Sequence, residues 1–221
     1  METSRIAESL QPFLETSGAL SAAQLNSIST YIDLLIRWNA RINLTSVRQS
    51  EAIVTRHFGE SLFAARHLFP DAGPSASLID VGSGAGFPGV PFKLWAPQLH
   101  LTLIESNHKK VAFLRQLART ITLTNIDIVP GRAEAYPGAP ADVVTLRAVE
   151  RFSSALPIAA RLVAPGGRLV LLIGQAQVAE AKSLVPSVTW SNPVPFPLSE
   201  SRVLFVGRAR ETKRIGSQDS F

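Results

Sequence analysis

The chain has 221 residues, of which 46% are hydrophobic and 18% charged, and its net charge is +5. This length and apolar content exclude intrinsic disorder and predict one large domain, or one with a small extension. Because cysteine is absent, disulfides, thiolate metal sites and cysteine nucleophiles are excluded together. No apolar run approaches the roughly 18 residues of a membrane helix, and the N-terminus lacks a signal-peptide layout. We expect a soluble, cytoplasmic protein that does not associate with membranes.

Helical patterns dominate the N-terminal third of the chain. Ser21 to Gln24 fits a capping box before a stripe of apolar residues at helical spacing, and a second helical pattern runs from Glu51 to Phe69. The turn-forming stretch Pro70 to Ser75 then interrupts the helical pattern. We therefore expect three parts: a helical N-terminal extension packed on the core (1–73), a main domain (74–209) and a basic polar tail (210–221).

Beyond the turn, short apolar runs alternate with amphipathic stretches. The expected strands are 77–81, 99–104, 126–129, 142–146 and 168–173, and the expected helices are 89–95, 109–121 and 152–163. This alternation predicts parallel strands joined by right-handed crossovers. Residues 188–190 and 202–206 form two further strand patterns with no helix between them, which predicts an antiparallel pair at the edge. The expected fold is α/β and Rossmann-like, with a mostly parallel seven-stranded sheet.

A glycine-rich loop follows the first expected strand and opens a helix. It carries glycine at 82, 84, 86 and 89, and Gly84 to Gly89 matches the pattern G-x-G-x-x-G. In open α/β sheets, ligands bind beyond the carboxyl ends of the strands, where this loop falls. Glu105, at the end of the second strand, lies 21 residues after Gly84, a spacing that places an acidic group near a ribose diol. The pattern predicts a cofactor that contains adenosine.

Three features favour S-adenosyl-L-methionine over a dinucleotide. Asp80 directly precedes the glycine loop, where a carboxylate repels a pyrophosphate but accepts hydrogen bonds from an ammonium group. The chain after the loop is too short for a separate substrate domain. Neither tyrosine, Tyr31 or Tyr136, begins the Tyr-x-x-x-Lys pair of single-domain dehydrogenases. The four histidines show no metal-ligand spacing, so no metal is expected.

Two more segments belong to the expected cofactor site. Ala133 and Glu134 follow the third strand, where an adenine ring would lie. Arg147 ends the fourth strand, and a buried arginine there needs an anionic partner. An internal salt bridge of Arg147 with Asp80 or Glu105 is the alternative interpretation.

The segment after the fourth strand restricts the reaction. It reads Thr145-Leu146-Arg147-Ala148 and lacks the Asn-Pro-Pro-Tyr type of motif found in enzymes that methylate exocyclic amines. Pyrimidine C5 methylation needs a cysteine nucleophile, which is absent. The remaining nucleophile is one that needs no general base, such as a purine N7. We therefore assign no catalytic residue and expect catalysis by positioning, which can supply roughly 7–11 kcal/mol.

Basic residues predict an RNA-binding surface. Net charge is −1 over residues 1–76 and +6 over residues 77–221, and such a local excess favours a polyanionic partner. His108, Arg115 and Arg119 share one face of the expected helix 109–121. A second basic cluster towards the C-terminus comprises Arg202, Arg208, Arg210, Lys213 and Arg214.

Several motifs together resemble one known family. They are Trp38-Asn39, Asn43 to Arg48, Arg56-His57-Phe58, Glu60-Ser61-Leu62, Asp80 to Gly89, Leu103 to Ser106, Lys109 to Arg115 and Arg147-Ala148. This combination resembles the glucose-inhibited division protein B family, bacterial methyltransferases that make 7-methylguanosine in 16S ribosomal RNA. The fold implied is that of a class I S-adenosylmethionine methyltransferase.

The resemblance also implies site residues and a partner. Implied cofactor contacts are Gly82, Phe87, Ala133, Glu134 and Arg147, which join Asp80, Gly84, Gly86 and Glu105 from the pattern above. Candidate substrate-binding residues are Asn43, Arg48, Arg56, His57, Arg115, Arg119 and Arg202. The implied substrate is 16S rRNA within the small ribosomal subunit, at guanosine-527 near the decoding centre. We expect a monomer.

Two positions depart from the family pattern. Leu146 stands where the family often has serine, and Ile173 stands where it commonly has a lysine that could contact the substrate. Two alternatives therefore stay open: a catalytically weak or inactive paralogue that binds RNA or the ribosome, and a methyltransferase of small molecules.

Overall fold

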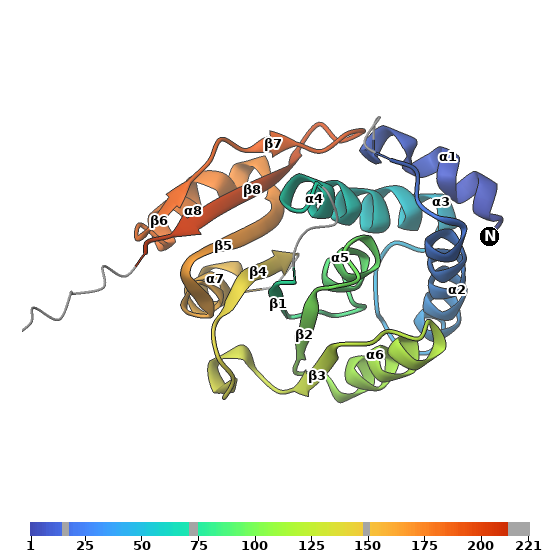
Figure 1. Ribbon diagram of the computed structural model, residues 1–221, viewed down its shortest axis with the longest axis horizontal. Coiled ribbons are helices and arrows are strands. Elements are labelled where there is room, and N and C mark those ends of the chain that lie inside the picture. Colours follow the sequence, from blue (N-terminus) through green and yellow to red (C-terminus); the bar gives the residue numbers. More distant parts are fainter. Residues whose placement is uncertain (15–17, 71–74, 148–150, 212–221) are drawn as a thin grey trace, which may run out of the picture.

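A single mixed sheet organises the molecule (Figure 1). The computed structural model describes residues 1–14, 18–70, 75–147 and 151–211. The strands are β1 (Ser77–Val81), β2 (His100–Glu105), β3 (Ile126–Pro130), β4 (Ala141–Arg147), β5 (Val163–Gly174), β6 (Val188–Trp190), β7 (Val194–Pro195) and β8 (Arg202–Ala209). Their order is β3-β2-β1-β4-β5-β8-β6, with β7 also paired to β8. The pairs among β1 to β5 are parallel, whereas β8 is antiparallel to β5, β6 and β7.

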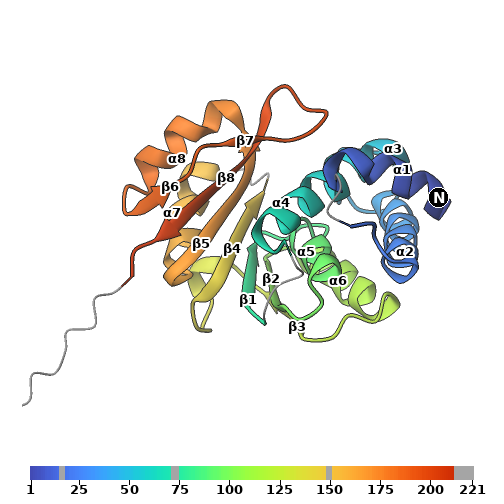
Figure 2. The ribbon, with the colours of Figure 1, turned by 45° about the horizontal axis from the view of Figure 1, so that its top comes forward.

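Helices cover both faces of the sheet (Figure 2). One face carries α4 (Glu60–Leu68), α5 (Gly89–Trp95) and α6 (His108–Thr120), and the other carries α7 (Phe152–Arg161) and α8 (Val178–Leu184). Each face buries its own hydrophobic cluster, because the parallel strands are apolar on both sides. Two single turns of 3₁₀ helix, η2 (Ala133–Ala135) and η3 (Gln175–Gln177), complete the main domain.

The N-terminal segment adds further helices to the first face. They are α1 (Thr3–Leu14), α2 (Ala22–Asn39), α3 (Ser50–Ala52) and the π-helical η1 (Ile53–Gly59), which leads directly into α4. The expected capping box is confirmed: Ser21 Oγ accepts from the Gln24 N–H, and the Gln24 side chain accepts from the Ser21 N–H. Gly59 lets α1 approach η1 closely, because a Cβ there would lie 2.6 Å from the Phe13 ring.

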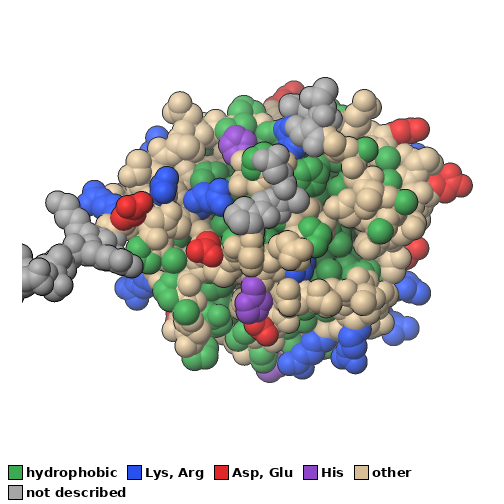
Figure 3. Space-filling model, viewed as in Figure 1, with side chains coloured by type: hydrophobic (Ala, Val, Ile, Leu, Met, Phe, Trp, Pro, Cys, Tyr) green, Lys and Arg blue, Asp and Glu red, His purple; other side chains and the backbone are tan. Residues whose placement is uncertain are grey.

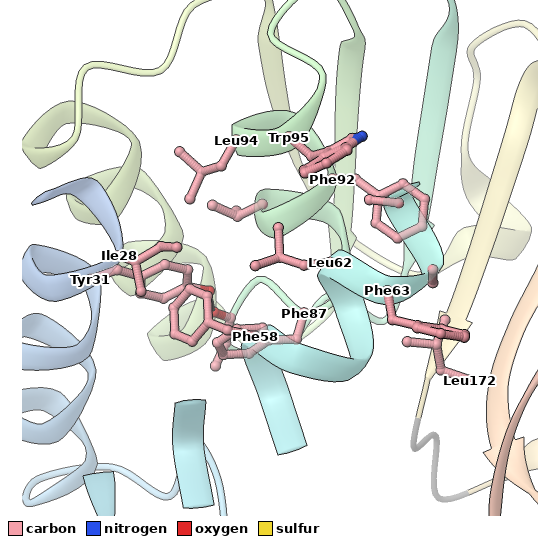
Figure 4. Packing of buried hydrophobic residues seen from close by; sticks show 14 of the residues in the cluster. Ile28, Tyr31, Phe58, Leu62, Phe63, Phe87, Phe92, Leu94, Trp95 and Leu172 are labelled. Atoms are coloured by element: carbon pink, nitrogen blue, oxygen red, sulfur yellow. Dashed lines mark hydrogen bonds between the residues drawn. The ribbon is translucent and has the colours of Figure 1, made fainter. Parts of the chain in front are cut away.

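The N-terminal helices and the sheet share one hydrophobic cluster (Figure 4). Tyr31 of α2 stacks on Phe87 of the glycine loop with ring centroids 5.1 Å apart, and Phe58 of η1 meets both rings edge-on. The α1 to α4 segment is therefore packed on the core by aromatic side chains. The expected boundary between residues 73 and 74 lies outside the described residues and stays a prediction, as does the tail beyond residue 211.

Most predicted elements lie within a few residues of the observed ones. The Rossmann-like fold and the antiparallel β6–β8 pair are confirmed, but β8 lies between β5 and β6, so of this pair β6 is the edge strand. The sheet has eight strands rather than seven, because the two-residue β7 pairs with β8. Helix α8 and the early start of β5 at Val163 were not predicted. Within the described part of the chain, no helix is long and apolar enough to cross a membrane.

Candidate functional site

The glycine loop between β1 and α5 turns back over the carboxyl ends of the strands. Gly84 and Gly86 have φ of +57° and +92°, a conformation that side chains with a Cβ rarely adopt. Gly86 also permits close packing, since a Cβ there would lie 2.7 Å from the Tyr31 hydroxyl. Tyr31 in turn donates its hydroxyl proton to the Ala85 carbonyl. The close packing at Gly86 and the hydrogen bond from Tyr31 thus hold the loop against helix α2.

Two buried carboxylates accept hydrogen bonds from backbone N–H groups of the loop and so fix its position. Asp80 is fully buried and accepts hydrogen bonds from Thr145 Oγ1 (2.8 Å) and the Gly89 N–H (3.2 Å). Burial raises the pKa of Asp80 to about 6, against the effect of those hydrogen bonds. Glu105 accepts from the Gly84 N–H at 2.8 Å and from the Asn107 N–H at 2.7 Å. Contrary to the expectation that Asp80 faces a ligand ammonium group, its carboxylate is directed at the loop backbone and lies off the cavity wall.

A cavity of about 370 Å³ opens above the loop. Its volume lies within the range of small-molecule sites, roughly 300–1,000 Å³. One wall is the glycine loop, through Gly82, Ser83, Gly84, Ala85 and Phe87. A second wall is the segment 43–47, which follows helix α2. The remaining lining residues are mostly basic: Arg56, His57, Lys110, Arg147 and Arg202.

Asn39 shapes the second wall. Its Oδ1 accepts from the backbone N–H groups of Leu44 (2.9 Å) and Thr45 (3.0 Å), and its Nδ2 donates to the Thr45 carbonyl (3.0 Å). These bonds satisfy polar backbone groups in the turn that follows the end of α2. Segment 43–47 is therefore held in a fixed position, with Asn43 at the cavity as the sequence predicted.

A buried network of charged groups forms the floor between the walls. Nη2 of Arg147, at the end of β4, shares its two protons among three acceptors: the Arg56 carbonyl (2.6 Å), His57 Nδ1 (3.1 Å) and Glu60 Oε2 (3.2 Å). Arg202 donates from Nε to the other Glu60 oxygen at 2.8 Å. The anionic partner of Arg147 is thus Glu60, and the alternative of Asp80 or Glu105 as its salt-bridge partner is wrong.

Glu60 is a site residue that sequence reasoning missed. It belongs to the motif Glu60-Ser61-Leu62, but its role was not assigned. Only 3% of its surface is exposed, although it lies in a helix whose other buried residues are mostly apolar. A carboxylate on the buried face of an amphipathic helix is the signal that could have identified it, because a buried charge requires a partner.

His57 is neutral in this environment. Its pKa is lowered from 6.5 to about 3, first by burial and then by the nearby guanidinium groups of Arg147, Arg56 and Arg202. Its ring also stacks on Phe87 of the glycine loop, with centroids 4.9 Å apart. His57 therefore joins the two walls of the cavity without adding charge.

Comparison with known proteins places the chain in a family. A family model described as rRNA small subunit methyltransferase G matches residues 24–198. Ribosomal RNA small subunit methyltransferase G of Chromobacterium violaceum is 36% identical over 194 residues, covering 87% of this chain and 91% of that protein. Its namesake in Staphylococcus saprophyticus is 32% identical over 215 residues, covering 91% and 89%. The chain belongs to the rRNA small subunit methyltransferase G family.

Family membership confirms the resemblance and the methyltransferase class predicted from the sequence. Solved structures confirm the fold alone. Magnesium protoporphyrin IX methyltransferase from Synechocystis PCC 6803, solved with bound SAM, aligns with a TM-score of 0.63 at 14% identity, covering 83% of this chain and 97% of that one. TYW2 of P. horikoshii, solved with MeSAdo, aligns with a TM-score of 0.57 at 15% identity, covering 70% and 63%.

The two departures from the family pattern lie away from the cavity. Leu146 on β4 is fully buried, and Ile173 on β5 is 3% exposed. Both side chains belong to the hydrophobic cluster on the α7 and α8 side of the sheet. In this member of the methyltransferase G family they serve as core residues, opposite the face that carries the N-terminal helices.

Several predicted site residues are not brought to the cavity. Ala133 and Glu134 form η2 after β3, half-buried and exposed, at the same edge of the sheet but off the cavity wall. Arg48 is exposed just beyond segment 43–47. Arg115 and Arg119 line a separate hollow with Leu123, Ile126 and Ile128 near edge strand β3. Of the α6 basic residues, Lys110 is the one that lines the cavity.

The predicted C-terminal basic cluster is divided by β8. Arg202 lies at the cavity, whereas Arg208, six residues along an extended strand and so about 20 Å away, pairs with Glu211 at 3.7 Å. Lys213 and Arg214 lie outside the described residues. Figure 3 shows Lys and Arg side chains over α6, at the lower right, and separately at the left near β6 and the end of β8. The expectation of a continuous cluster that includes Arg202 is therefore wrong.

Proposed function

We propose that this chain transfers a methyl group from S-adenosylmethionine to N7 of a guanine in 16S ribosomal RNA. One observation carries the proposal: a single cavity brings the glycine loop together with four cationic side chains. Lys110, Arg56, Arg147 and Arg202 suit an anionic substrate, and the loop suits an adenosine cofactor. Membership of the rRNA small subunit methyltransferase G family supports both the cofactor and the RNA class.

The residues at the loop fit this cofactor. The left-handed backbone at Gly84 leaves space on its cavity side, since even a Cβ there would meet only the Gly82 carbonyl at 3.8 Å. Glu105 is 6% exposed and, like Asp80, is not part of the cavity wall. Each of its oxygens accepts one backbone N–H and keeps a lone pair, which we assign to a ribose hydroxyl of the cofactor. Ala133 and Glu134 lie at the same sheet edge, on the side of β3 where the adenine would extend. We assign Arg147, with Gly82 and Phe87, to the methionine end.

The chemistry needs no general base from the protein. S-adenosylmethionine, when bound, supplies an electrophilic methyl group, so a nitrogen that carries a free lone pair, such as guanine N7, can accept it without losing a proton. The imidazole at the cavity, that of His57, has both nitrogens engaged, by Arg147 and Thr45. Its lowered pKa makes it a weak base. The protein contributes alignment of the two reactants.

Polar and basic residues of the cavity wall provide contacts for the RNA substrate. Arg56 and Lys110 both line the cavity and suit RNA phosphates, and Asn43 offers an exposed amide for a sugar or base. By the family resemblance we propose guanosine-527 of the small subunit as the target, methylated in the cytoplasm by a monomer.

Methyl transfer to small ribosomal subunits from a strain that lacks the gene tests the proposal. Purified enzyme with tritiated S-adenosylmethionine should label 16S rRNA, and mapping should place one 7-methylguanosine there. Calorimetry should show binding of S-adenosylmethionine and none of NAD(H). Salt-dependent binding to subunits without transfer would favour an inactive paralogue, whereas no salt-dependent RNA affinity would favour a small-molecule substrate.

A further inference from the structure

A chain of hydrogen bonds determines which ring nitrogen of His57 carries the proton. Arg147 Nη2 lies 3.1 Å from His57 Nδ1. Burial lowers the pKa of the Arg147 guanidinium to about 10, so the group stays charged at neutral pH and has only donors. Nδ1 of His57 must therefore accept, and the neutral ring carries its proton on Nε2. That N–H points to Thr45 Oγ1 at 2.8 Å, so His57 donates and Thr45 accepts.

The Thr45 hydroxyl can consequently donate a further hydrogen bond but cannot accept one. Its oxygen also accepts from the Val47 N–H at 3.1 Å, so both lone pairs are occupied. Its proton is the one bonding capacity left, and the part of the chain that the structure describes offers this proton no acceptor. Thr45 lines the same cavity as the glycine loop, as part of segment 43–47. The hydroxyl therefore presents a donor, and no acceptor, to whatever lies between the walls.

We propose that Thr45 selects guanine over adenine by donating its hydroxyl proton to the carbonyl oxygen at C6 of the target base. The inference rests on the proposed function, because it requires a purine whose N7 receives the methyl group. Guanine carries an oxygen acceptor beside N7, whereas adenine carries an amine donor at the same place. With the cofactor against the loop, we place the base against segment 43–47, where the Thr45 hydroxyl would meet the edge that contains N7.

The neighbouring groups enforce this choice. A hydroxyl with free lone pairs could rotate and accept from adenine, but His57 and Val47 occupy both lone pairs of Thr45. An adenine amine would then face a second donor, and neither would find a partner in the other. Arg147 and His57 are positioning residues in this respect, since they act on the base through Thr45.

A double-mutant cycle between enzyme and base tests the proposal. Wild-type enzyme and Thr45→Val act on small subunits reconstituted with guanine, hypoxanthine or 2-aminopurine at the target nucleotide. Hypoxanthine keeps the carbonyl, and 2-aminopurine lacks it. We expect wild type to lose about ten- to hundredfold in kcat/KM on 2-aminopurine relative to guanine, beyond the loss on hypoxanthine. Thr45→Val should show a correspondingly smaller loss, and the cycle cancels any change in the intrinsic reactivity of N7.

Thr45→Ser keeps the hydroxyl and should show the wild-type preference for bases that carry the carbonyl. If Thr45 had a purely structural role, the loss of kcat/KM in Thr45→Val would be the same for all three bases. The affinity for S-adenosylmethionine, measured by calorimetry, should be the same in wild type, Thr45→Ser and Thr45→Val. Equal losses on 2-aminopurine in wild type and Thr45→Val would overturn the proposal, and so would a Thr45→Val defect confined to cofactor affinity. Wild type that fails to methylate guanine at all would instead contradict the proposed function. If Thr45→Val does not fold, the same cycle with Thr45→Ala, which also removes the hydroxyl, decides.

Discussion

Arg202, at the start of β8, binds the Glu60 carboxylate from Nε at 2.8 Å and 3.0 Å to its two oxygens. The two residues lie 142 positions apart, so this ion pair joins the last long strand to the N-terminal helices. Arg147 shares the same carboxylate, and all three side chains are largely buried. One carboxylate thus holds two guanidinium groups at the cavity floor.

Removing the charge of Glu60 should destabilise the protein strongly. In Glu60→Gln, two guanidinium groups remain in a buried site with no negative charge, a situation that typically costs about 3–5 kcal/mol. Urea unfolding measures the loss. The control is Glu51→Gln, which removes an exposed carboxylate paired with exposed Arg5 and should change the free energy of unfolding by less than about 1 kcal/mol. Equal effects of the two substitutions would contradict a structural role for the buried network.

His57 should make the stability depend on pH below neutrality. Its pKa of about 3 in the folded protein lies below the unfolded value of 6.5, so the unfolded state binds more protons between these pH values. Its contribution to stability is fully present above pH 6.5 and is lost as the pH falls towards 3, with a slope of at most about 1.4 kcal/mol per pH unit.

Substitution isolates this contribution. His57→Gln should flatten the increase in stability with pH over that window, and urea unfolding at several pH values measures it. Asp80 acts in the opposite sense, because its raised pKa removes stability as the pH rises from about 4 to 6, but this contribution is common to both proteins and cancels in the difference. The matched control is His108→Gln, which makes the same substitution at an exposed position of α6, so the difference between the two variants isolates the buried ring.

Gly84 should be needed for cofactor binding beyond its effect on stability. With φ of +57°, Gly84→Ala strains the backbone by about 1–2 kcal/mol and shifts the N–H that Glu105 accepts. We expect about a tenfold loss of affinity for S-adenosylmethionine by calorimetry. Gly166, near the start of β5, has φ of +74° and lies off the cavity wall, and a Cβ there would meet only the exposed Glu211 side chain, at 3.3 Å. Gly166→Ala should lower stability to a similar extent and leave cofactor affinity intact.

Local patterns were enough to predict the frame of the fold. A short apolar run and the amphipathic stretch after it placed β1 and α5 correctly, and the glycines at and before the start of α5 located the cofactor loop. The two-residue strand β7 had no such signal, because it contains a proline and pairs only through β8. The π-helical turn at Ile53–Gly59 was equally hidden, since its geometry follows from packing of η1 against α1 rather than from a sequence period.

The site was less predictable because its partners meet only after folding. Arg147 was expected to need an anion, but local sequence favoured Asp80 and Glu105, which are instead occupied by backbone N–H groups of the loop. Glu60 becomes the partner because α4 packs over the end of β4. Arg115 and Arg119 were likewise predicted to bind the substrate because they share one face of α6. They lie too far along the helix to reach the cavity.

The N-terminal end of α6, rather than its C-terminal end, should contact the RNA. Lys110 lines the cavity, whereas Arg119 lies nine residues further on, about 13 Å along the helix. Lys110→Gln should weaken binding to small ribosomal subunits and reduce the slope of log K against log salt by about 1, as expected for one lost phosphate contact. Arg119→Gln removes a charge of the same sign from the same helix and should leave the slope unchanged. Filter binding over roughly 50–200 mM KCl measures both. A reduced slope for Arg119→Gln alone would place the RNA on the outer face of α6 and separate RNA binding from the cavity.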